Sequence, residues 1–154
     1  MTNNDILRRL RYALNLDNAG IIRLFTLGGH ALSQEDLDLL LKKDDEPGFV
    51  ECPDVLLSAF LDGLITSRRG ARESAPDAAE TLNNNLILRK SRIALELKDA
   101  DMVRIFEAGG MEISKSELSA FFRKPGHRNF VYCRDQLLRK FLSGLATISR
   151  EELS

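Results

Sequence analysis

Apolar residues along the chain fall mainly at helical spacing. Ile6, Leu10, Ala13 and Leu14 share one face of a helix, and Asn3, just before them, is a favoured N-cap residue, so a first helix is predicted to start after Asn3. No window shows the sustained alternation of a half-buried strand, although "GFVEC" and "NFVYC" each predict a short extended segment. The pattern predicts an all-α fold.

The chain contains one unit twice. A shift of 81 residues aligns "NNDILRRLRYALNL" with "NNLILRKSRIALEL", and the register continues without a gap over 67 positions, of which 29 are identical. This is an internal duplication. It predicts repeat one at 1–70, a linker rich in Ala, Glu, Ser and Pro at 71–83, repeat two at 84–150 and a C-terminal tail at 151–154.

Each repeat is predicted to hold four helices. The second helix follows Asp17 or Asp99, the third opens at Ser33 or Ser114 with a capping-box-like start, and the fourth follows Pro53 or its counterpart. A unit of this size buries only a marginal core, so we expect the two four-helix repeats to pack together with approximate pseudo-twofold symmetry.

A glycine pair recurs at Gly28 and Gly29 and at Gly109 and Gly110, and it suggests either a phosphate-binding loop or a helix C-cap. No strand precedes the pair, and neither a Gly-Lys-Ser/Thr sequence nor a third glycine at the dinucleotide spacing follows it. The pattern favours the C-cap, where glycine enters the left-handed region without penalty.

A helix, a glycine turn and a capped helix also resemble a helix-turn-helix unit. In repeat one the helix after the turn is acidic, which opposes binding to phosphates. Repeat two is more permissive, and its candidate contacts with nucleic acid or another partner are Lys115, Arg123, Lys124, His127 and Arg128. A solvated basic surface is the competing interpretation.

Arg11 and its counterpart Arg92 fall within or beside the apolar stripe of the first helix. A guanidinium there is costly unless it is paired. Outside the linker, Asp54 and Asp135 are the only acidic residues that are identical between the repeats, so we predict ion pairs from Arg11 to Asp54 and from Arg92 to Asp135. Alternatively, both arginines lay their stems on the core and their charged groups in water.

The sequence shows no motif for catalysis, metal binding or a cofactor. His30 and His127 occupy non-equivalent positions, and Cys52 and Cys133 are isolated from any zinc-like spacing. We therefore predict no enzyme activity, no bound cofactor and two reduced thiols.

Composition places the chain among ordinary globular proteins, with 44% apolar and 29% charged residues. Its start has no signal sequence and no run could span a bilayer, so a cytoplasmic location without membrane contact is expected. The net charge of −1 hides a split: residues 1–70 carry 8 basic and 11 acidic side chains, and residues 84–154 carry 13 and 9. The loop "KKDDEPGF" of repeat one becomes "RKPGHRNF" in repeat two.

Three segments carry a resemblance to a known family: "NNDILRRLRYAL", "LFTLGG" and "CPDVLLSAFLDGLI", each echoed in repeat two. They resemble the YehS-like bacterial proteins, which are small tandem-repeat proteins. The resemblance covers almost the full length and implies no activity and no site residues.

Three functions remain open from the sequence. The first is a non-catalytic helical module that binds a macromolecular partner, most simply a protein, through its repeat faces. The second is nucleic-acid binding through the helix-turn-helix-like unit of repeat two. The third is a small-ligand binder or enzyme with a pocket between the repeats.

Overall fold

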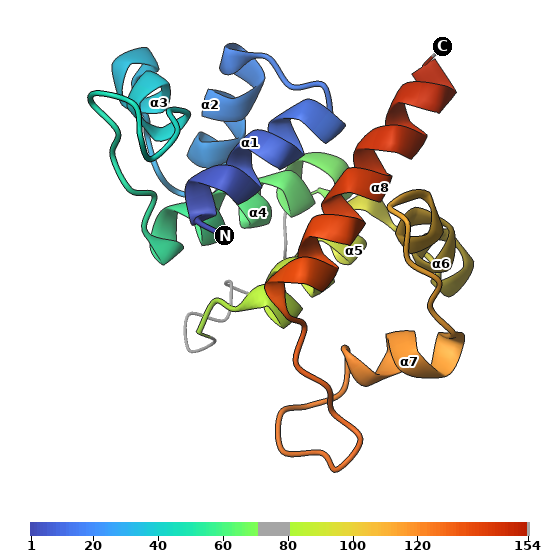
Figure 1. The fold of residues 1–154 in the computed structure, drawn as a ribbon. Helices are drawn as coiled ribbons and strands as arrows, with labels where there is room; N and C mark the ends of the chain where they lie inside the picture. The colour runs from blue at the N-terminus through green and yellow to red at the C-terminus, as the bar shows by residue number, and fades with distance from the viewer. Residues whose placement is uncertain (71–80, 154) are drawn as a thin grey trace. The chain divides into compact units, whose positions relative to one another are not determined.

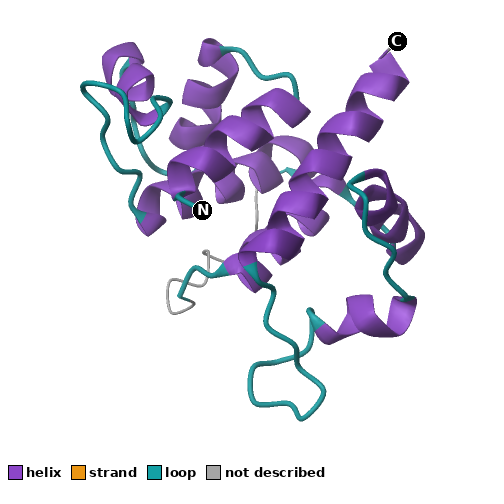
Figure 2. Cartoon of the chain, viewed as in Figure 1, coloured by secondary structure: helices purple, strands orange, loops and turns teal. Residues whose placement is uncertain are grey.

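The computed structural model describes residues 1–70 and 81–153, and it divides the chain into two units, Met1–Leu82 and Asn83–Ser154. The described residues contain eight α-helices and no strand (Figures 1 and 2). The all-α prediction is therefore confirmed, whereas the extended segments expected at "GFVEC" and "NFVYC" are irregular loop. Residues 71–80 of the predicted linker lie outside the described part of the chain. The predicted twofold packing of the repeats stays a prediction.

The first unit contains α1 (Asn3–Ala13), α2 (Asn18–Leu27), α3 (Gln34–Leu40) and α4 (Asp54–Arg69). Within it, α4 packs against α1 and α2, and α3 contacts α2 (Figure 1). Phe25 of α2 and Phe60 of α4 are fully buried, with ring centroids 5.5 Å apart. This aromatic pair lies in the core of the unit and joins its two most closely packed helices.

The second unit contains α5 (Asn84–Leu95), α6 (Asp99–Ala108), α7 (Lys115–Ala120) and α8 (Asp135–Leu153). Here α8 packs against α5 and α6, and Phe106 and Phe141 form the equivalent core pair at 5.7 Å. The helix α8 continues past residue 150, where the sequence analysis ended the second repeat.

The helix starts partly match the sequence analysis. Ser33 and Ser114 are the N-caps of α3 and α7, as predicted, and their hydroxyls accept hydrogen bonds from the third-position amides at 3.0 and 3.1 Å. The first helices begin one residue earlier than expected, because the side chain of Thr2 caps α1 and that of Asn83 caps α5. Asp17 caps α2, but Asp99 lies inside α6.

The glycine pairs end α2 and α6, as the C-cap interpretation predicted. Gly29 and Gly110 have φ of +96° and +92°, a conformation that favours glycine. The first glycine of each pair has an ordinary φ and serves a different purpose. A Cβ added to Gly28 would overlap the backbone carbonyl oxygen of Ala59 in α4, so the residue must be small for the two helices to approach.

Two further glycines complete these close approaches. A Cβ on Gly63 of α4 would overlap the carbonyl oxygen of Leu24, and one on Gly144 of α8 would overlap that of Ile105. The sequence analysis missed both residues. Their identity in the two repeats, inside otherwise apolar helices, was the available signal.

Candidate functional site

In each unit, an exposed loop before the last helix is held in place by several hydrogen bonds. We call residues 41–53 loop 1 and residues 122–134 loop 2. Loop 1 connects α3 to α4, and loop 2 connects α7 to α8. Loops on a rigid scaffold commonly carry binding residues, so the contacts that hold these two loops define the candidate site.

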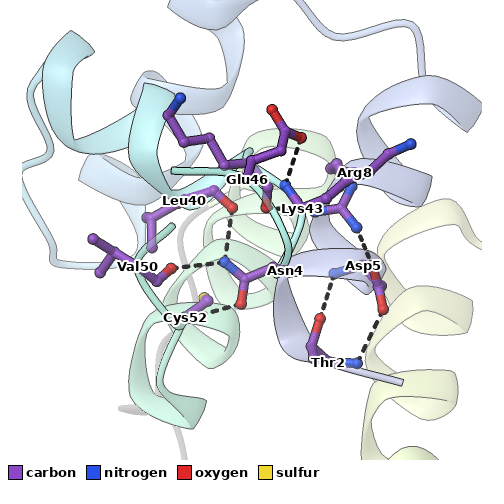
Figure 3. Close-up of polar contacts among 10 residues, drawn as sticks. Thr2, Asn4, Asp5, Arg8, Leu40, Lys43, Glu46, Val50 and Cys52 are labelled. Carbon is purple, nitrogen blue, oxygen red and sulfur yellow. Dashed lines mark hydrogen bonds and ion pairs between the residues drawn. The ribbon is translucent and has the colours of Figure 1, made fainter. Parts of the chain in front are cut away.

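A buried asparagine on α1 holds loop 1. Asn4 is fully buried, and its Nδ2 donates hydrogen bonds of 2.8 Å to the carbonyl oxygens of Leu40 and Val50. Its Oδ1 accepts a 2.9 Å hydrogen bond from the Cys52 amide (Figure 3). One side chain therefore satisfies three backbone groups at the two ends of the loop, which fixes the distance between those ends.

Loop 2 is held in the same way by Asn85 of α5. Its Nδ2 donates to the carbonyl oxygens of Phe121 and Val131, both at 3.0 Å, and its Oδ1 accepts from the Cys133 amide at 2.8 Å. The sequence analysis did not single out Asn4 or Asn85. A polar residue repeated at the buried start of an apolar stripe is a signal that could have identified them.

The backbone of the two loops also matches turn for turn. In loop 1 the Glu46 amide donates to the Lys43 carbonyl at 3.0 Å and the Phe49 amide to the Glu46 carbonyl at 3.2 Å. In loop 2, His127 donates to Lys124 at 3.0 Å and Phe130 to His127 at 2.9 Å. Equivalent positions thus form equivalent turns, although the side chains on them differ.

The predicted ion pairs of Arg11 and Arg92 are wrong. Asp54 accepts a 2.7 Å hydrogen bond from Asn3, and Asp135 accepts one of 2.8 Å from Asn84. The bond from Asn84 holds the pKa of the Asp135 carboxyl below its usual value. These neutral donors occupy the aspartates because they sit on the first residue of α1 and α5, one turn or more before the arginines.

The two arginines have different surroundings in the two units. Arg92 pairs with Asp99 at 2.5 Å, donates to the Leu97 carbonyl at 3.1 Å and lies over the Phe122 ring at 4.7 Å. Arg11 is half-buried, and the described residues give its guanidinium no hydrogen bond or ion pair, as in the alternative interpretation for this residue.

A second arginine of α1 ties this helix to loop 1. Arg8 forms an ion pair with Asp5 (Figure 3). Its Nη1 also donates a 2.8 Å hydrogen bond to the Lys42 carbonyl. The N-terminal half of α1 therefore reaches loop 1 through Asn3, Asn4 and Arg8. This set of contacts restricts the conformations that loop 1 can adopt.

The candidate basic residues gather in loop 2. Arg123, Lys124, His127 and Arg128 are all exposed within six consecutive positions. Lys115 lies apart from them, as the first residue of α7. Because α7 has only six residues, most of the basic side chains follow it instead of lying on it. The second helix of the helix-turn-helix-like unit is thus short and carries little of the positive charge.

The cysteines sit at the ends of the loops, where they are buried and free. Burial raises the pKa of the Cys52 thiol to about 11 and that of Cys133 to about 12, and the nearby carboxylates of Asp54 and Asp135 act in the same direction. Both thiols are therefore poor nucleophiles near neutral pH. Among the residues that the structure describes, no group of three or more His, Cys, Asp or Glu side chains could hold a metal ion.

Within the described ranges, no helix is long and apolar enough to cross a membrane. This finding concerns the eight helices named above.

Comparison with known proteins gives two matches. The model of a family described as "Protein of unknown function (DUF1456)" matches residues 3–70 and again residues 84–151. The uncharacterized protein YehS of Escherichia coli (strain K12) is 45% identical over 148 residues, which cover 95% of each chain. No solved structure matches this chain. The two family matches coincide with the two repeats seen in the sequence.

Proposed function

Because this chain belongs to the DUF1456 family, whose description gives no activity, we propose from its own geometry that it is a non-catalytic helical module that binds another protein through loops 1 and 2. The observation that supports this proposal most directly is the repeated loop scaffold. Both units use a buried asparagine with three backbone contacts to hold an otherwise exposed loop.

An exposed valine marks the same point on each loop. Val50 is 45% exposed and Val131 is 48% exposed, although the carbonyl of each accepts a hydrogen bond from the buried asparagine. The backbone is therefore fixed while the apolar side chain remains in water. A partner that covers these valines gains apolar burial without the entropy cost of ordering the loop.

Affinity capture from the native cells tests this proposal. We expect the wild-type chain to retain a specific protein and the Val50→Gln, Val131→Gln double variant to lose it. Val55→Gln is the matched control, because Val55 is 59% exposed on α4 and its counterpart in the second unit is already Gln136. Retention by the double variant, or equal loss in the control, contradicts the proposal.

Nucleic-acid binding is a second candidate, and the observation that favours it is the exposed basic cluster of loop 2. Such binding releases counterions, so the affinity for a DNA or RNA oligonucleotide is expected to fall steeply with salt. The Arg123→Glu, Lys124→Glu, Arg128→Glu variant is expected to abolish binding. An affinity that changes with neither salt nor these substitutions excludes this candidate.

A further inference from the structure

Loops 1 and 2 carry opposite charges on matching backbones. Loop 1 has two basic and four acidic side chains, whereas loop 2 has four basic and no acidic side chains. The difference lies in the acidic positions: Asp44, Asp45, Glu46 and Glu51 are replaced by uncharged side chains in loop 2, which are Pro125, Gly126, His127 and Tyr132. Lys42 and Lys43 keep basic counterparts, and loop 2 adds Arg128 and Arg134. Glu46 and His127 each join two consecutive turns of the shared backbone. The chain therefore presents two surfaces of similar shape and complementary charge.

Most of these charges have no partner in their own unit. Asp44, Asp45 and Glu51 of loop 1 are exposed, and the described residues offer them no hydrogen bond or ion pair. In loop 2, the same is true of four basic side chains: Arg123, Lys124, Arg128 and Arg134. These groups remain available to a binding partner.

Exposed charge alone is usually solvated, so a second feature must mark a contact surface. Each loop also carries exposed apolar side chains beside its charges: Val50 in loop 1, and Val131 with Tyr132 in loop 2. Tyr132 is 51% exposed, and tyrosine is enriched where proteins meet. An apolar centre with a charged rim is the usual arrangement of an interface.

We propose that loop 1 of one molecule binds loop 2 of a second copy of this chain. This inference rests on the proposed function, because it names the partner. A second copy is the occupant that the charges fit, since every chain supplies one acidic and one basic loop on the same scaffold. Every copy carries both loops, so each copy can offer its loop 1 to one molecule and its loop 2 to the same or another molecule.

Because the proposed contact is partly electrostatic, its strength is expected to depend on salt. Charges near the surface are screened over about 8 Å at physiological ionic strength. Self-association is therefore expected to be strongest at low salt, and to weaken about tenfold or more as salt rises from about 50 mM to about 500 mM.

Complementary charge reversal tests the proposal. One variant makes both loops basic (Asp44→Lys, Asp45→Lys, Glu51→Lys), and the other makes both acidic (Arg123→Glu, Lys124→Glu, Arg128→Glu). Glu46 is left unchanged because its carboxylate accepts a hydrogen bond from the Lys43 amide within the loop. Sedimentation velocity over a concentration series measures association of the wild type, of each variant and of an equimolar mixture of the two variants.

We expect each variant alone to associate at least about tenfold more weakly than the wild type, because its two loops now repel. The equimolar mixture is expected to regain wild-type association, since each basic loop again meets an acidic one. A control with the same change in net charge as the basic variant is Glu35→Lys, Glu107→Lys, Glu112→Lys. These three residues are exposed and lie outside both loops, so this control is expected to associate like the wild type.

Three results overturn the proposal: a wild-type chain that stays monomeric at about 100 μM in low salt, variants that associate as well as the wild type, or a mixture that does not associate. If the chain is monomeric and the valine variants nevertheless lose a captured protein, the proposed function stands with a different partner. If it self-associates through the loops, the second copy is that partner.

Discussion

Asn4 in the first unit and Asn85 in the second make the same three backbone hydrogen bonds, yet the loops that they hold differ in net charge, because only loop 1 carries acidic side chains. Buried polar groups tolerate little change, because each lost partner leaves a desolvated group behind. Exposed charges contribute little to stability and can change sign freely. The comparison shows a common scaffold that fixes the shape of both loops and an exposed surface whose charge differs between them.

Close helix packing is the most sensitive part of the shared scaffold. Gly63→Ala and Gly144→Ala each place a Cβ on a backbone carbonyl oxygen, so each is expected to destabilise its own unit by about 3 kcal/mol or more. Native-state hydrogen exchange measures the opening free energy of each unit separately.

The left-handed glycines provide the control for this prediction. Gly29→Ala and Gly110→Ala strain only the local backbone, and the added Cβ meets no backbone atom of another helix. Each is therefore expected to destabilise its unit by about 1 to 2 kcal/mol. Equal losses at all four glycines would contradict the distinction between packing and turn positions.

Removing the loop anchors is expected to have the next largest effect. Asn4→Ala and Asn85→Ala each leave two carbonyls and one amide without their partner, which costs about 2 to 3 kcal/mol. Hydrogen exchange at the Cys52 and Cys133 amides measures the loss directly, because these amides donate to the Oδ1 atoms that the substitutions remove.

Asn3→Ala and Asn84→Ala serve as neighbouring controls, because their bonds to Asp54 and Asp135 are exposed. Asn3 also donates to the Cys52 carbonyl, but the Cys52 amide whose exchange is measured donates to Asn4. We expect roughly 1 kcal/mol or less from each. If the anchor variants exchanged no faster at the two cysteine amides than these controls, the scaffold would not depend on Asn4 and Asn85.

Alkaline pH is expected to destabilise both units through their thiols. The unfolded thiol ionises near its ordinary pKa of 9.0, while the folded Cys52 keeps its proton until about 11 and Cys133 until about 12. Stability is therefore fully present below pH 9.0 and decreases as the pH rises through the folded values, on the order of 1 kcal/mol per pH unit for each thiol.

Urea unfolding between about pH 8 and pH 10.5 measures this slope. Cys52→Ala and Cys133→Ala are expected to reduce the slope, and the double variant to reduce it most. If the double variant kept the wild-type slope, the loss of stability at alkaline pH would have to come from groups other than the two thiols.

Removal of the helix caps is expected to have the smallest effect on the stability of the units. Ser33→Ala and Ser114→Ala each remove one cap hydrogen bond and are expected to cost about 1 kcal/mol. In the second unit Glu117 also accepts from the Ser114 amide at 3.2 Å.

This reciprocal bond allows the contribution of the cap to be compared between the two units. Glu117→Ala should destabilise α7, whereas Asp36→Ala should leave the cap of α3 intact, because the described residues show no bond from the Ser33 amide to the Asp36 carboxylate. Amide exchange in the two short helices measures the difference, and equal effects would show that the reciprocal bond contributes nothing.

Much of the fold could be predicted from the sequence because it depends on local and periodic features. Helical spacing gave the helices, and the serine caps and glycine turns gave several of their ends. The partners of Arg11 and of Arg92 could not be predicted this way. A position on the apolar stripe does not tell which side chain lies close enough to bond to Asp54 or Asp135. Asn3 and Asn84 are shorter and closer, so they take those contacts.

The sequence by itself determined the duplication, the helical class and the charge difference between the loops, since repetition, periodicity and charge are properties of residue order. Only the tertiary structure decided that Asn4 and Asn85 anchor the loops and that Gly28 and Gly63 let two helices meet. These roles depend on groups that are distant in the chain. A hydrogen bond from residue 4 to residue 50, or an overlap between residues 24 and 63, exists only after the helices have packed.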